Sequence, residues 1–359
     1  MAEYITLAIK FYTYFFHMQH SVRKLIQTGF YACLAVISVV VNSVNAQVIP
    51  VLQNKQTAAL AWHSSSPWTD AVTRGALATF ARFNIEVVAI TDAQYDPVKQ
   101  LADLESIDAL SPTMVLSLSV DSVATYSGYR QLLDAGTKLV LLSNPIESLK
   151  AHKNFAGFIS VDTQAMGRAA AQLIDMAVAH KGNVGVIFHE AEYFITNHRD
   201  SAFLDALDAY HGIRVVAKQG FVQEQDTSAV AMAMLLKQPN IDAIYVSWEK
   251  AAEGVIEALR LMGRKNVKVV SHDLGISTLL DMAQGGNMYA VVSDRPYDIG
   301  VAMAMTAINE QQGNVGLLAN STEYDLVTKD NLATVWPLAF HSNLPYDLQC
   351  IVSVKQVCE

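Results

Sequence analysis

Short apolar segments alternate with amphipathic segments along most of this chain, and this alternation restricts the fold more than any other feature. Residues 57–62 form an apolar run typical of a buried strand, and residues 68–83 repeat apolar side chains with the period of a helix. Nearly continuous apolar strands are typical of parallel sheets with helices on both faces. We therefore predict an α/β fold. The predicted strands are 57–62, 85–90, 114–118, 138–142, 184–188, 214–218, 241–246 and 267–271, and the predicted helices are 68–83, 97–110, 122–135, 163–180, 199–210, 227–236 and 251–262.

The alternation breaks after residue 142 and restarts at residue 163, which gives two successive runs of similar length. A mature chain of roughly 310 residues is too long for one comfortable hydrophobic core. We therefore predict two doubly wound lobes, each built on a parallel sheet. The two runs share a structural pattern without a detectable sequence repeat.

The first 46 residues have the features of an export signal. A basic stretch at 20–24 precedes an uncharged apolar run at 29–41, and Val44-Asn45-Ala46 has the small-x-small pattern that signal peptidase cleaves. The apolar run is too short to span a bilayer comfortably as a permanent helix. We predict that residues 1–46 are a signal peptide and that the mature chain begins at Gln47, in the periplasm.

Two alternatives for the N-terminus stay open. One is a membrane anchor that remains on the protein. The other concerns the start, because a second apolar stretch at 5–16 makes the leader unusually long. Initiation at Met18 instead of Met1 would give a leader of ordinary length.

The charge balance argues against several classes of partner. The chain has 25 basic and 34 acidic residues, a formal net charge of −9, and removal of the predicted leader makes this about −11. An acidic chain without a basic block is a poor candidate for binding nucleic acid or an anionic lipid surface. We therefore expect no nucleic acid and no membrane surface among its partners.

Two cysteines remain in the predicted mature chain, Cys350 and Cys358, close together near the C-terminus. In an oxidising compartment they would form a short-loop disulfide, and two free thiols are the alternative. The sequence contains no CxxC or HExxH pattern, so we expect no metal site and no cofactor.

Polar or aromatic side chains follow nearly every predicted strand, at the edge where parallel sheets bind their ligands. Ser, Asp and Asn also cap the following helix, so capping is the alternative at each polar position. Trp68 and Trp248 have no capping role and can point away from the sheet core. The candidate binding residues found in this way are Ser66, Trp68, Asn144, Trp248, Glu249 and Asp273.

Four stretches carry a family resemblance through their order and spacing. They are Ser65-Ser-Pro-Trp68 followed by Gly75; Phe158-Ile-Ser-Val-Asp162 leading to Gly167; Ile244-Tyr-Val-Ser-Trp248-Glu249 leading to Gly254; and Val269-Val-Ser-His-Asp273 followed by Val291-Val-Ser-Asp294-Arg-Pro-Tyr-Asp-Ile-Gly300. Over residues 57–335 the chain resembles the type I periplasmic binding proteins, in particular the ribose/galactose-type sugar-binding components of ABC importers.

The resemblance implies a ligand pocket in a cleft between the lobes. Trp68 would stack on the apolar face of a sugar ring, Arg199 would fork onto adjacent hydroxyl groups, and Asp273 would accept hydroxyl protons. The alternative for Arg199 is an exposed residue at a helix start, and for Asp273 a loop carboxylate in water.

This chain departs from the family pattern at several pocket positions. Asp294 replaces a polar residue that is often Gln, with an exposed loop carboxylate as its alternative. Trp248 and Glu249 replace Asn and Asp, although Glu249 is also suited to a helix start. Asn144, with the serine before it, stands where many sugar binders have Asp-Arg.

The pocket implied by these positions is acidic. Glu249, Asp273 and Asp294 face one arginine, Arg199, with Arg295 as a second candidate. Such a pocket fits a neutral sugar or polyol, or a ligand with a positive group, better than a sugar acid or a phosphate.

Function would then come from closure of the lobes around the ligand. The resemblance implies a periplasmic, monomeric solute-binding protein that delivers a small sugar or polyol to an ABC transporter permease in the inner membrane. The alternative partner is a membrane sensor kinase. Three crossover segments are expected near 158–161, 292–294 and 321–324. The N-terminal lobe would comprise residues 55–158 and 295–322, and the C-terminal lobe residues 159–294 and 323–359.

Other functional classes fit the sequence less well. A repressor of this fold would need a helix-turn-helix where this chain has a leader. For an enzyme, the sequence has no Gly-x-Ser-x-Gly elbow, Walker A loop or dinucleotide fingerprint. Neighbours in a strand point to opposite sides, so His272 and Asp273 make a poor catalytic pair. We therefore predict a binding protein that is not an enzyme.

Overall fold

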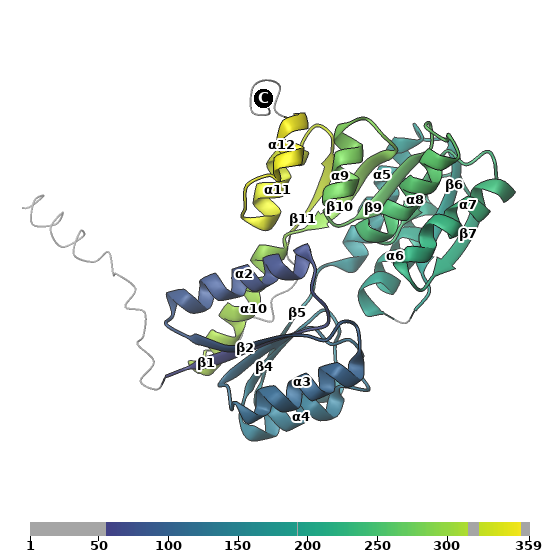
Figure 1. Ribbon diagram of the computed structural model, residues 1–359. Coiled ribbons are helices and arrows are strands. Elements are labelled where there is room, and N and C mark those ends of the chain that lie inside the picture. Colours follow the sequence, from purple (N-terminus) through teal and green to yellow (C-terminus); the bar gives the residue numbers. More distant parts are fainter. Residues whose placement is uncertain (1–54, 192, 315–322, 353–359) are drawn as a thin grey trace, which may run out of the picture. The chain divides into compact units, whose positions relative to one another are not determined.

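A computed structural model describes residues 55–191, 193–314 and 323–352, whose strands form two sheets (Figure 1). The strands of the first sheet are β1 (Thr57–Trp62), β2 (Glu86–Asp92), β3 (Met114–Ser117), β4 (Lys138–Leu142) and β5 (Phe155–Ile159). Those of the second are β6 (Gly182–His189), β7 (Ile213–Phe221), β8 (Ala243–Val246), β9 (Lys268–His272), β10 (Met288–Asp294) and β11 (Tyr324–Thr328).

The two sheets share one topology. The first has the order β2-β1-β3-β4-β5, and all of its strand pairs are parallel. The second has the order β7-β6-β8-β9-β10, also parallel, with β11 added antiparallel to β10. The order reverses direction next to β1 in one sheet and next to β6 in the other, which defines a doubly wound fold. The predicted α/β class with two doubly wound sheets is confirmed.

Helices connect and cover these strands (Figure 1). The α-helices are α2 (Pro67–Arg82), α3 (Pro97–Ala109), α4 (Tyr126–Ala135), α5 (Thr163–Ala177), α6 (Phe194–Leu207), α7 (Thr227–Lys237), α8 (Glu249–Leu261), α9 (Ile276–Ala283), α10 (Pro296–Gln311), α11 (Leu332–Phe340) and α12 (Tyr346–Val352). Two 3-10 turns are η1 (Glu147–Leu149) and η2 (Glu224–Asp226). No helix within the described residues has the length and apolar character needed to cross a lipid bilayer.

Strand β1 shows how its sequence places a sheet between two helix layers. Successive side chains of a strand point to opposite faces. Leu60 lies in one buried cluster with Phe80 of α2, and Ala61 lies in another with Leu104 of α3. All of these side chains are fully buried, so both faces of β1 must be apolar.

The chain passes from one sheet to the other more than once. After β5 in the first sheet, α5 packs against β8, β9 and β10 of the second. After β10, α10 packs against α2, β4 and β5, and the chain then forms β11 on the second sheet. The predicted crossover at 321–324 begins outside the described residues.

Close helix contact requires glycine where α2 meets α10, which lie side by side (Figure 1). A Cβ at Gly75 would lie 2.0 Å from the carbonyl oxygen of Tyr297, and one at Gly300 would lie 1.9 Å from that of Val72. Any larger residue at either position would push the two helices apart.

The strand predictions are more accurate than the helix predictions. The predicted strands at 57–62 and 138–142 match β1 and β4 at both ends. The predicted start of the helix at Arg199 is wrong, because α6 begins at Phe194. The first turn of α6 contains Phe, Ile and Thr, whose helix propensity is low, and Tyr193 supplies no side-chain cap.

The ends of the chain leave two predictions untested. The predicted signal peptide, 1–46, lies outside the described residues. Cys350 of α12 is disulfide-bonded, but its predicted partner, Cys358, also lies outside them.

Candidate functional site

All eight predicted site residues stand at or beyond the carboxyl ends of parallel strands, including Ser66 after β1, Asn144 after β4 and Trp248 after β8. Trp68 lies in α2 after β1, and Arg199 lies in α6 after β6. Glu249 begins α8 after β8, Asp273 follows β9 directly, and Asp294 ends β10. Ligands of doubly wound sheets bind at this edge.

Trp68 and Asp294 meet although they belong to different sheet layers. The indole Nε1 of Trp68 donates to Oδ1 of Asp294 over 2.8 Å. Asp294 is only 3% exposed. Burial, together with the nearby charge of Asp273, raises the pKa of the Asp294 carboxyl to about 7. The exposed-loop alternative for Asp294 is therefore excluded.

Arg199 is buried at the centre of this cluster. Its Nη1 lies 3.2 Å from both carboxylate oxygens of Asp273, and its Nη2 donates to the carbonyl oxygen of Ser247 over 3.1 Å. Its Nε has no hydrogen-bond partner in the described structure. Arg199 is 4% exposed, which excludes the exposed helix start considered for it. Helix α6 begins at Phe194, so Arg199 lies within the helix and not at its terminus.

Asp273 adopts a left-handed backbone conformation, with φ of 66°. A non-glycine residue in this region is uncommon and carries strain. Its backbone N–H donates to the carbonyl oxygen of Val292 over 2.9 Å, which ties the turn after β9 to β10. This hydrogen bond holds Asp273 in its strained conformation beside Arg199.

A second carboxylate, which the sequence did not identify, lies behind Arg199. Asp200 accepts hydrogen bonds from Tyr245 Oη over 2.7 Å, from Ser247 Oγ over 2.6 Å and from the backbone N–H of His189 over 3.2 Å. Burial raises the pKa of Asp200. Tyr245 was a possible signal, since a tyrosine in a fully buried strand needs a partner for its hydroxyl group.

Glu249 has a carboxyl group without a side-chain partner among the described residues. Burial raises its pKa to about 8, and the charge of Asp273 adds to this effect. The helix-start role agrees with its place as the first residue of α8. That role alone leaves its partly buried charge without an opposite charge among the described residues.

Trp248 lies in a different environment from Trp68. Its Nε1 donates to Oε1 of Glu224 over 2.7 Å. Its ring is edge-on to His189, with 4.9 Å between centroids, and tilted against Phe221 at 4.8 Å. Contact of Trp248 with a ligand stays a prediction.

Ser66 and Asn144 bond to backbone groups of their own surroundings. Ser66 Oγ accepts from the backbone N–H of Thr69 over 3.1 Å and caps α2, as the capping alternative expected. Asn144 is 5% exposed and donates from Nδ2 to the carbonyl oxygen of Ser119 over 2.7 Å. Its Oδ1 accepts from no described residue.

Arg295, the second candidate for a pocket arginine, is used elsewhere. Its Nε and Nη2 lie 3.0 Å and 3.2 Å from the two carboxylate oxygens of Asp325, and Nη1 contacts Glu323. Arg295 therefore ties the start of α10 to β11.

An aromatic cluster beside the carboxylates was also missed. The His63 ring lies 5.1 Å from that of Tyr95, edge to face, and 6.3 Å from that of Tyr193. Gln94 and Tyr95 both have positive φ, 56° and 60°. Tyr95 is 61% exposed, and partial desolvation of its hydroxyl group together with the charges of Glu224, Glu249 and Asp273 raises its pKa. The sequence shows only a polar turn here, so nothing marked Tyr95.

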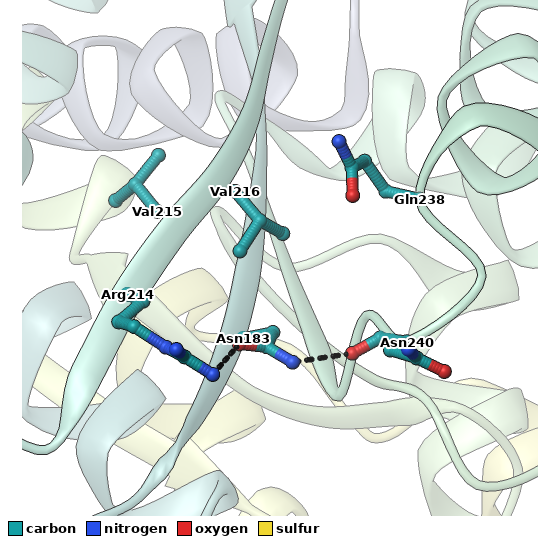
Figure 2. A pocket seen from close by; sticks show the side chains of 6 residues that line it. All are labelled: Asn183, Arg214, Val215, Val216, Gln238 and Asn240. Atoms are coloured by element: carbon teal, nitrogen blue, oxygen red, sulfur yellow. Dashed lines mark hydrogen bonds between the residues drawn. The ribbon is translucent and has the colours of Figure 1, made fainter.

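A surface hollow of about 550 Å³ lies away from these residues. Figure 2 shows Asn183 among its lining residues, with Oδ1 accepting from Arg214 and Nδ2 donating to the carbonyl oxygen of Asn240. These residues lie where β6 and β7 begin, so the hollow is at the opposite strand ends. Within the described residues, no three His, Cys, Asp or Glu side chains are grouped to hold a metal ion.

The chain is similar to two sugar-binding proteins. It is 30% identical over 181 residues to the D-allose-binding periplasmic protein of Escherichia coli (strain K12), and the matched region covers 50% of this chain. It is 27% identical over 213 residues to the D-ribose/D-allose-binding protein of Pseudomonas aeruginosa, which covers 58% of this chain. The chain spans 58% of the length of the first relative and 66% of the second.

Its fold is similar to that of an ABC transporter solute-binding protein from Agrobacterium vitis bound with α-D-tagatopyranose. The TM-score is 0.73 at 19% identity, over 80% of this chain and 99% of the other. This likeness confirms the predicted fold class. Residues 58–314 match the family described as "Periplasmic binding protein domain". That match covers most of the sequence, and the chain belongs to the periplasmic binding protein family.

Proposed function

We propose that this protein captures a small sugar or polyol and delivers it to an ABC importer. The observation that carries the proposal is the joint position of Trp68, Arg199, Asp273 and Asp294, held by hydrogen bonds at the strand ends. An indole ring suits the CH face of a sugar, and a guanidinium fork with carboxylates suits its hydroxyl edges. The names of the two relatives point to the same class of ligand.

We further propose that the ligand lies between two lobes. These are residues 55–158 with 295–322 and residues 159–294 with 323–359. Trp68 would serve from the first lobe, and Arg199, Trp248, Glu249, Asp273 and Asp294 from the second. A ligand that contacts both lobes favours the closed state by its differential affinity for that state.

A thermal-shift screen of residues 47–359 against monosaccharides and polyols tests the proposal. A ligand that binds only the folded state must raise the melting temperature. We expect a shift for at least one sugar, and calorimetry on that sugar should give a 1:1 complex. The absence of any shift across aldoses, ketoses and alditols would contradict it.

The location and partners need their own tests. We propose export through the signal peptide 1–46 into the periplasm, as a monomer that docks on a permease in the inner membrane. N-terminal sequencing of the periplasmic fraction should begin at Gln47. Crosslinking of the loaded protein should then capture a permease subunit; capture of a sensor kinase would favour the alternative partner.

A further inference from the structure

The carboxylates of the proposed site outnumber the cations that could neutralise them. Arg199 forms an ion pair with Asp273, and Asp200 adds a second negative charge close to the same guanidinium. Glu249 and Asp294 form no ion pair with any described residue. Lys250, the neighbour of Glu249, is paired with Glu253 and its side chain is 56% exposed.

This imbalance is costly without a ligand. A buried carboxylate that lacks an opposite charge is strongly destabilised, and it responds by holding its proton. The pKa values of Glu249, about 8, and Asp294, about 7, have this cause, since burial and the charge of Asp273 raise both. A cation placed beside them would remove the cost.

The same cluster has unused hydrogen-bonding groups. Arg199 is 4% exposed, yet its Nε donates to no described residue. His272 is fully buried beside it, and neither ring nitrogen has a partner in the described structure. A ligand that brings hydroxyl groups could satisfy the arginine donor while a charged group meets the acids.

Aromatic rings also border the acids. The Trp68 indole is hydrogen-bonded to Asp294. Tyr95 is 61% exposed but lies near enough to Glu249 and Asp273 for their charges to raise its pKa. Aromatic faces attract cations, most strongly where water is excluded. Carboxylates and rings together form an environment suited to an ammonium group.

We propose that the ligand is an amino sugar or an amino polyol, whose ammonium group contacts Asp294 or Glu249 while its hydroxyl groups face Arg199 and Asp273. This inference rests on the proposed function and narrows its ligand class. It goes beyond the neutral sugars named for the related proteins.

Matched pairs of ligands test the inference. Calorimetry at pH 7 would compare glucosamine with glucose, galactosamine with galactose, mannosamine with mannose and, for the polyols, glucamine with glucitol. We expect at least one amino sugar to bind tighter than its neutral partner by about tenfold or more. Equal or tighter binding of every neutral partner would overturn the inference and leave the sugar-binding function intact. No binding of any amino or neutral sugar or polyol would contradict both.

Two isosteric variants locate the charge. Asp294→Asn and Glu249→Gln each remove a carboxylate, and we expect at least one of them to lower the amino-over-neutral preference by about tenfold. Glu253→Gln is the matched control, because Glu253 lies on the same helix outside the cluster, and it should keep the preference. An unchanged preference in both site variants would overturn the inference.

Proton release gives an independent reading. At pH 7 both carboxyl groups hold protons for part of the time, and an ammonium ligand would displace them. The binding enthalpy of the amino sugar should therefore change with the ionisation enthalpy of the buffer, in the direction of proton release. Proton uptake, or no linkage, would overturn the assignment of the ammonium group to these acids.

Discussion

Trp68 and Asp294 are 226 residues apart in the sequence, yet the indole Nε1 of one donates to the carboxylate of the other over 2.8 Å. The bond joins a helix that covers the first sheet to a strand of the second. Because Asp294 is buried and forms no ion pair within the described residues, this donor is its main source of stabilisation.

Trp68→Phe should therefore destabilise the protein in a pH-dependent way. The folded-state pKa of Asp294, about 7, lies above the ordinary value of 3.8, so ionisation costs the folded state stability as pH rises through this range. The indole N–H offsets part of that cost. We expect a loss of about 1–3 kcal/mol at pH 8.5, where Asp294 is charged, and a much smaller loss at pH 5.5. Urea unfolding at the two pH values measures both.

Trp62→Phe is the matched control for this experiment. Trp62 also donates from Nε1, but to the neutral hydroxyl group of Thr73 over 2.8 Å. Its loss should cost a similar free energy at both pH values. If Trp68→Phe behaves in the same pH-independent way, Asp294 does not titrate in this range.

Arg199 and Asp273 should be coupled in stability as well as in binding. Arg199→Met leaves a largely buried carboxylate without its cation and should cost about 3 kcal/mol. The pair Arg199→Met with Asp273→Asn removes both charges, so the double variant should be more stable than the sum of the single effects predicts, by about 1 kcal/mol. Urea unfolding of the four proteins measures this cycle. Strict additivity would show that the ion pair contributes no stability.

The strands could be predicted because a strand that is buried on both faces consists almost entirely of apolar residues. In strand β4, residues 139–142 form one apolar run, and each of these four residues is fully buried. Helix starts were harder, since α6 begins without a capping side chain and with residues of low helix propensity. The early start matters for the candidate site, because it places Arg199 inside the helix, where it is 4% exposed.

The candidate site could be predicted where a residue followed a strand or matched a position of the family pattern. Trp68 and Asp273 follow strands, Arg199 and Asp294 were named from the family resemblance, and the structure joins the four in two hydrogen-bonded pairs. The contacts of Asp200 with Tyr245 depend on the register of β8 against α6, which no single segment reveals. The position of Tyr95 depends on a turn in which two successive residues have positive φ. Neither of them is a glycine, which would have marked the turn in the sequence.

Gly167→Ala should disturb Arg199 from the opposite helix. A Cβ at Gly167 in α5 would lie 2.4 Å from the carbonyl oxygen of Arg199 and 2.9 Å from the backbone nitrogen of Phe203. Because these are backbone atoms, α6 would have to move. We expect a stability loss of about 1–3 kcal/mol, and a weaker affinity for whichever sugar the screen identifies.

The neighbouring exposed position provides the control for this helix pair. Arg168→Ala, on the solvent side of α5, should change stability by less than about 0.5 kcal/mol and leave affinity unchanged. Calorimetry of both variants measures the affinity, and thermal unfolding measures the stability. Normal affinity in Gly167→Ala would mean that the position of α6 does not control the arginine.

Arg295 and Asp325 should stabilise β11 locally. The guanidinium holds both oxygens of the carboxylate, and the two side chains are 23% and 20% exposed. Arg295→Met should cost about 1 kcal/mol. Local opening of the antiparallel pair β10–β11 should become easier, so amide hydrogen exchange in residues 324–328 should speed up more than in β8 or β9.

As a comparison, Arg130→Met breaks an exposed ion pair with Asp134 and should change stability by less than about 0.5 kcal/mol. Uniformly faster exchange in all strands would show that Arg295 supports the whole fold, and unchanged exchange in 324–328 would show that it does not hold β11.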